Sequence, residues 1–113
     1  MNDLQKVSAD LSNRAMRFIL SLQTTRNVDL NSFEAILDCI KSASEILKRQ
    51  ENVPKAFLKD LRIVSKTLRA EAPHFGDDAI TLLKMAERLE YLFDLILLGE
   101  SQADRKPGVP RFS

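Results

Sequence analysis

Apolar residues recur every three or four positions along most of the chain, and no stretch alternates with a period of two. This spacing places apolar side chains on one face of an α-helix and predicts helices at about residues 2–25, 32–50, 54–72 and 78–98. The expected core stripes are Leu4, Val7, Leu11, Ala15, Phe18 and Leu22; Phe33, Ile36, Leu37, Ile40, Ala43 and Leu47; Phe57, Leu61, Val64, Leu68 and Ala72; and Leu82, Ala86, Leu89, Phe93 and Ile96. The pattern therefore predicts an all-α fold.

Residues that favour helix ends lie between these stretches. Asn31, followed three residues later by Glu34, has the spacing of a capping box and predicts the start of the second helix. Pro54 fits the first turn of the third helix, and Pro73 is expected to stop it. Asp77 is a favourable N-cap for the fourth helix.

The connections between the predicted helices are short, so successive helices are expected to run antiparallel. Residues 1–99 of the 113-residue chain are therefore expected to form one domain, an up-down-up-down four-helix bundle. Residues 100–113 are polar, contain Pro107, Gly108 and Pro110, and are expected to form a disordered or strap-like C-terminal tail.

The composition excludes several kinds of site. The single cysteine, Cys39, has no disulfide partner, and with the single histidine, His74, it leaves too few ligands for structural zinc. Three glycines are too few for a glycine-rich phosphate loop, and no apolar run reaches membrane-spanning length. The start of the chain lacks the positive charge of a signal peptide. We expect a cytoplasmic protein with no metal, no cofactor and no membrane association.

Some apolar side chains are predicted to point away from the core when residues are placed at about 100° per step around each helix. They are Ala9, Met16 and Leu20 in the first helix and Ile80, Tyr91, Leu95 and Leu98 in the fourth. The first and fourth helices are neighbours in the expected bundle, so these residues are predicted to form one surface for a homodimer or a partner protein. Alternatively, they cover a slightly splayed bundle, or the tail folds back onto them. Ile63 is the one clear apolar exception on the outer side of the third helix.

A row of basic side chains follows the outer face of the third helix at steps of three and four. This basic row consists of Lys55, Lys59, Arg62, Lys66 and Arg69. Like charges at these spacings repel one another, so counter-charges are expected. Acidic side chains of the second helix (Glu34, Asp38 and Glu45) are one source, and an acidic protein or the phosphates of a nucleic acid are others. Nucleic-acid binding is not favoured because no aromatic residue lies among the basic ones.

His74 is the first candidate for chemistry, because it titrates near neutral pH. Its position five residues after Arg69 resembles the arginine-x4-to-6-histidine signature of HEPN-type ribonuclease toxins, which are dimeric helical bundles. The resemblance covers these two residues and implies a ribonuclease that uses both. The chain departs from the signature at Ala70, where the family has a polar residue, and at Pro73, which interrupts the helix before His74.

The tail carries a motif that consists of Arg105, Lys106, Arg111 and Phe112. It is a candidate recognition segment, because its prolines lower the entropic cost of docking in an extended form. Together these features predict a small non-enzymatic helical interaction module, an adaptor, chaperone-like holder or regulator, that is homodimeric and binds a protein partner of acidic character. Nucleic-acid association through the basic row is the first alternative, and a ribonuclease that uses Arg69 and His74 is the second.

Overall fold

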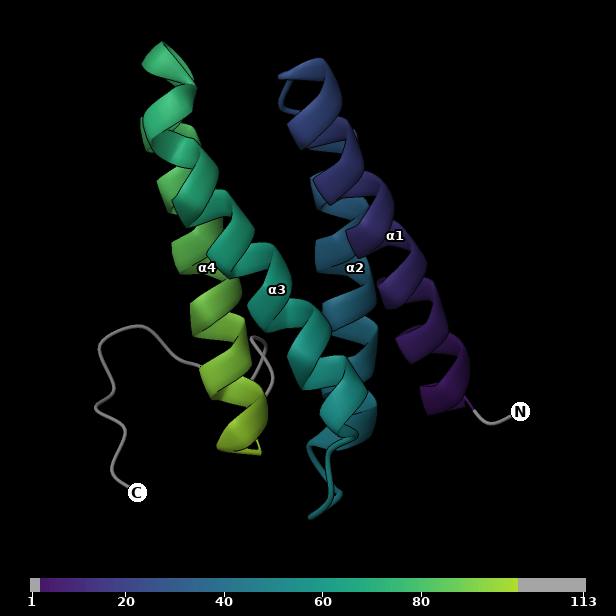
Figure 1. Cartoon of the computed structure of the whole chain (residues 1–113). Coiled ribbons are helices and arrows are strands. Elements are labelled where there is room, and N and C mark those ends of the chain that lie inside the picture. Colours follow the sequence, from purple (N-terminus) through teal and green to yellow (C-terminus); the bar gives the residue numbers. More distant parts are fainter. Residues whose placement is uncertain (1–2, 100–113) are drawn as a thin grey trace.

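Four α-helices run alternately up and down in the computed structural model, which describes residues 3–99 (Figure 1). They are α1 (Asp3–Thr25), α2 (Leu30–Leu47), α3 (Lys55–Glu71) and α4 (Ala79–Leu97), with two short 3-10 turns, Ala72–His74 and Gly76–Asp78, between α3 and α4. The all-α four-helix prediction is confirmed. The tail motif (Arg105, Lys106, Arg111 and Phe112) lies outside the described residues.

The helix ends follow local side-chain chemistry, with two differences from the prediction. Asp29, not Asn31, caps α2, because its extended backbone lets its carboxylate accept hydrogen bonds from the Ser32 amide at 3.0 Å and the Ser32 hydroxyl at 2.8 Å. These bonds to the charged form lower the pKa of Asp29. Asp78 rather than Asp77 directly precedes α4, because the 3-10 turn extends to that residue.

The predicted core stripes form the core. All five residues of the third predicted stripe are buried, four in α3 and Ala72 in the 3-10 turn that follows it. Phe18 of α1 meets Phe33 of α2 with ring centroids 5.8 Å apart. Leu4, Val7, Leu37 and Phe93 are only partly buried at its edge. The buried arc of α4 is broader than predicted and also includes Met85, Leu92 and Leu95.

The order in which the helices pack is not the expected one. The sequence predicts α1 and α4 as neighbours, and this is wrong: α1 packs against α2 and α3, while α4 packs mainly against α3. The α1–α2 hairpin and the α3–α4 hairpin lie side by side, as Figure 1 shows. They meet along α1 and α3. The bundle is flat, with extents of 40 × 39 × 20 Å.

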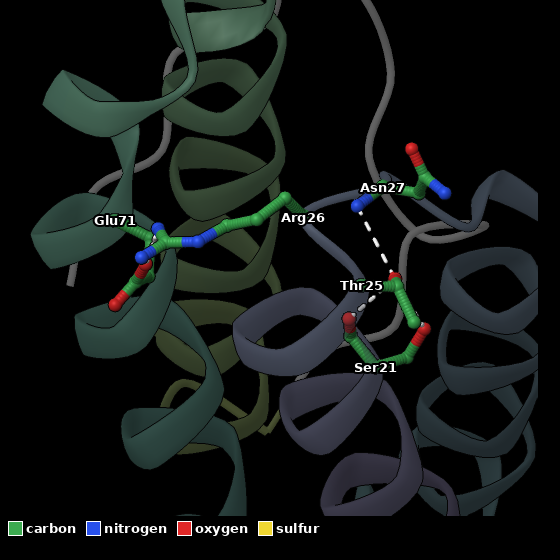
Figure 2. Close-up of polar contacts among 5 residues, drawn as sticks. All are labelled: Ser21, Thr25, Arg26, Asn27 and Glu71. Atoms are coloured by element: carbon green, nitrogen blue, oxygen red, sulfur yellow. Dashed lines mark hydrogen bonds and ion pairs between the residues drawn. The ribbon is translucent and has the colours of Figure 1, made fainter.

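A side-chain contact connects the two hairpins at the end of α1. Arg26 has a left-handed backbone (φ 61°) directly after α1, and its guanidinium donates to the Glu71 carboxylate at the end of α3, 3.2 Å away (Figure 2). Beside it, the Thr25 hydroxyl donates to the Ser21 carbonyl at 2.7 Å and accepts from the Asn27 amide at 3.3 Å. This contact joins the α1 and α3 ends at one end of the interface between the hairpins.

Candidate functional site

A shallow groove of about 230 Å³ lies between α1 and α3 on the outside of the bundle. Its lining is mostly apolar and comes from both helices. The lining residues are Ser12, Ala15, Met16, Ile19, Leu20, Gln23, Asp60 and Ile63. We call this the α1–α3 groove.

The walls of the groove are apolar side chains that the core does not use. Met16 is 70% exposed and Leu20 is 60% exposed. They are four residues apart, so both lie on the same side of α1, the side away from the core. Ala9, two turns before Met16, is exposed on the same side. Ile63 of α3, 40% exposed, forms the opposite wall. The sequence therefore located the apolar side of α1 but paired it with the wrong helix.

The predicted face of α4 is separate from this groove. Leu95 was expected to point outward, and this is wrong: it is 1% exposed. The last turns of α4 lie against the end of α2, where a Cβ atom on Gly99 would be 3.7 Å from the Lys48 carbonyl oxygen.

Ile80, Tyr91 and Leu98 are exposed as predicted, and Leu83, which the sequence interpretation missed, is exposed with them. Glu87 and Asp94 lie on the same line of the helix at steps of three and four. We call these six residues the α4 outer face. It combines four apolar side chains with two carboxylates.

Side chains of α4 contact two of the five residues of the basic row. Arg69 binds Glu90 of α4 through two hydrogen bonds of 2.7 and 2.6 Å, which raise the pKa of Arg69 and lower that of Glu90. Arg62 lies over the Phe93 ring, 5.3 Å from its centroid. The expected counter-charges on the second helix are not the ones used, because α1 and α4 are the helices that flank α3.

The three lysines of the basic row remain in solvent. Lys55, Lys59 and Lys66 are exposed, and none of them forms an ion pair with a side chain in residues 3–99. Lys59 and Lys66 lie one turn before and one turn after Ile63. The α3 wall of the groove therefore consists of Asp60 and Ile63, and Ile63 is flanked along the helix by two lysines.

Asp60 is the one carboxyl group that lines the α1–α3 groove. Partial burial raises its pKa, although the neighbouring Lys59 and a hydrogen bond with Ser12 act in the opposite direction. The groove thus already withdraws part of this side chain from water.

A second hollow, of about 200 Å³, lies between α1 and α2 and contains Cys39. The Cys39 thiol donates to the Asp10 carboxylate at 3.1 Å, and Arg14 donates to the same oxygen at 3.0 Å. Burial and the nearby carboxylate raise the pKa of Cys39 to about 11, while the thiol and Arg14 lower the pKa of Asp10. The thiol is therefore protonated at neutral pH, as expected of a buried cysteine rather than a nucleophile.

His74 lies exposed at the end of the 3-10 turn Ala72–His74, while the Arg69 guanidinium is held by Glu90 on α4. Within residues 3–99, no cluster of three or more His, Cys, Asp or Glu side chains is arranged to hold a metal ion. No helix in that range combines the length and apolar character needed to cross a membrane. Comparisons with models of protein families, with curated proteins and with solved structures find no match to this chain.

Proposed function

We propose that this protein is a small helical interaction module that binds another polypeptide in the α1–α3 groove. The observation that carries the proposal is the exposure of Met16, Leu20 and Ile63 around one apolar groove. Full burial of one such side chain contributes about 1.5–3 kcal/mol. Covering three of them together is therefore a substantial driving force for association.

The shape of the groove supports this proposal. Two neighbouring helices form its walls, and their small and apolar side chains form its floor. Amphipathic helices bind in grooves of this kind by placing side chains one turn apart into the hollow. The lysines at its edge provide charges that select among apolar partners.

The division of the basic row favours a protein over a nucleic acid as the partner. Binding to a phosphate backbone gains strength from each cation that replaces a counterion. Two of the five cations, Arg62 and Arg69, are already engaged with α4. Two of the exposed lysines, Lys59 and Lys66, flank Ile63 of the apolar groove, and no aromatic residue of the described chain lies among them. This arrangement is better suited to an apolar partner with acidic edges.

Site-specific photo-crosslinking in cells tests the proposal. A photoreactive amino acid at position 20 faces the groove, and the same amino acid at Lys41 of α2, which is exposed elsewhere, is the matched control. We expect one discrete polypeptide adduct from position 20 and none from position 41. Equal labelling from both positions, or no adduct from position 20, would contradict the proposal.

A further inference from the structure

The α4 outer face is a second apolar surface, and it carries two carboxylates. Glu87 is close enough to Arg69 of α3 to help raise the pKa of its guanidinium, and Asp94 lines a small hollow between α3 and α4 beside Arg62. The apolar residues of the face are exposed, with Ile80 at 66%. Neither Glu87 nor Asp94 forms an ion pair with a side chain in residues 3–99. Like the groove, this face presents exposed apolar side chains, and covering them with another surface is energetically favourable.

The residue order on the α4 outer face repeats that on the α3 wall of the groove. On α4, Tyr91 has Glu87 four residues before it and Asp94 three residues after it. On α3, the central apolar residue likewise has one lysine four residues before it and another three residues after it.

The charges are therefore opposite and their spacing is the same. Lys59 and Lys66 are seven residues apart, as are Glu87 and Asp94. At 1.5 Å of rise per residue, each pair spans about 10 Å along its helix. Two helices laid side by side with this spacing align both acids with both lysines, whether the helices run parallel or antiparallel.

We propose that the α1–α3 groove binds the α4 outer face of a second copy of this chain. In this contact Tyr91 of one copy packs against Ile63 of the other, and its flanking carboxylates meet Lys59 and Lys66. This inference rests on the proposed function and names the partner.

The charges also distinguish this occupant from the protein's own C-terminal segment. Residues 100–113 carry three basic residues, Arg105, Lys106 and Arg111, and two acidic ones, Glu100 and Asp104, so their net charge is +1 and the basic residues lie toward the end. Docked in the groove, that segment places positive charges beside Lys59 and Lys66, which is unfavourable. The α4 outer face places negative charges there.

Each copy carries both surfaces, so the contact either forms twice in a closed dimer or continues into a longer assembly. In both cases its strength depends on the two pairs of opposite charges. Reversing one set brings like charges together and weakens the contact, and reversing both sets restores complementarity. This reciprocity makes the proposal testable with the purified protein.

The experiment measures self-association by sedimentation over a concentration series in two charge-reversed variants. One variant carries Lys59→Glu and Lys66→Glu, and the other carries Glu87→Lys and Asp94→Lys. We expect the wild type to self-associate and each variant to do so at least about tenfold more weakly. An equimolar mixture of the two variants is expected to associate again, because each groove then meets an oppositely charged α4.

The matched control is Lys41→Glu with Arg49→Glu, which changes the net charge as much as the lysine variant does but at exposed positions on α2 and just after it. Circular dichroism and thermal unfolding establish that each variant is folded. The control is expected to associate like the wild type. Association that survives both reversals, or a mixture that stays monomeric, would overturn the proposal.

A wild-type chain that remains monomeric at hundreds of micromolar would also overturn it. The crosslink from position 20 then separates the two ideas. A crosslink to another protein, or to residues 100–113 of the same chain, identifies a different occupant of the groove. The absence of any crosslink removes the proposed function as well.

Discussion

Replacing Met16 and Leu20 with glutamine separates the role of these side chains in binding from any role in folding. Because Met16 is 70% and Leu20 is 60% exposed, less than half of each is withdrawn from water. Full burial contributes about 1.5–3 kcal/mol, so losing the buried part lowers the free energy of unfolding by about 1 kcal/mol per residue at most. The matched control is Leu22→Ala, in the same helix.

Leu22 is 1% exposed and lies in the core. Its truncation removes buried methyl groups and leaves a cavity, which lowers the free energy of unfolding by about 2–5 kcal/mol. We therefore expect the single core substitution to lower the free energy of unfolding more than the double substitution at the groove does, even though the double variant replaces two apolar side chains.

Urea unfolding followed by circular dichroism measures both effects at low protein concentration, where the chain is expected to be a monomer. At high concentration, the unfolding midpoint of the wild type is expected to rise because association stabilises the folded state. The midpoint of the double variant is expected not to rise. A double variant as unstable as Leu22→Ala at low concentration would refute the reasoning, since it would mean that a single chain already buries Met16 and Leu20.

Three further predictions concern other parts of the structure. Gly99→Ala is expected to lower the free energy of unfolding by about 1 kcal/mol in urea titrations, because φ of 74° is unfavourable for a residue with a Cβ atom. Asp10→Asn is expected to lower the pKa of Cys39 from about 11 and to speed its alkylation by iodoacetamide at pH 8, and an unchanged rate would contradict the assigned contact. In the wild type, the ionised Asp10 stabilises the fold above its ordinary pKa of 3.8, and this stabilisation is lost as the pH falls through the lowered pKa of the folded state. Acid unfolding of Asp10→Asn is therefore expected to show no such pH-dependent loss of stability.

The helices and the core were predictable because both depend on local periodicity. An apolar residue at every third or fourth position marks the buried side of a helix whatever that side packs against. The third predicted stripe, from Phe57 to Ala72, is buried throughout. The end of α3 before Pro73 was predictable for a similar local reason, since proline cannot continue a helix.

The neighbours of each helix were not predictable in the same way. Periodicity shows which side of α1 is apolar but not which helix packs beside it. The expected bundle placed α4 beside α1, where the structure has α3. The same error predicted counter-charges on α2 for Arg69, whose partner is Glu90 of α4. One signal did point to the groove: Ile63 was the clear apolar exception on the outer face of the third helix.

Single residues at helix ends depended on geometry that the sequence leaves open. Both Asp29 and Asn31 are good capping residues. The backbone conformation that makes Asp29 the cap of α2 appears only in the structure. Leu95 is similar, because its burial depends on how the other helices pack around α4, which the periodicity of α4 does not determine.

The most direct measurement of the central claim uses the methionine methyl groups as reporters in nuclear magnetic resonance. Met16 lines the α1–α3 groove, whereas Met85 is buried in the core and provides an internal control. If a second copy covers the groove, the Met16 methyl signal shifts or broadens as the protein concentration rises, and the Met85 signal stays in place. A Met16 signal that is unchanged from micromolar to millimolar concentration would contradict the claim.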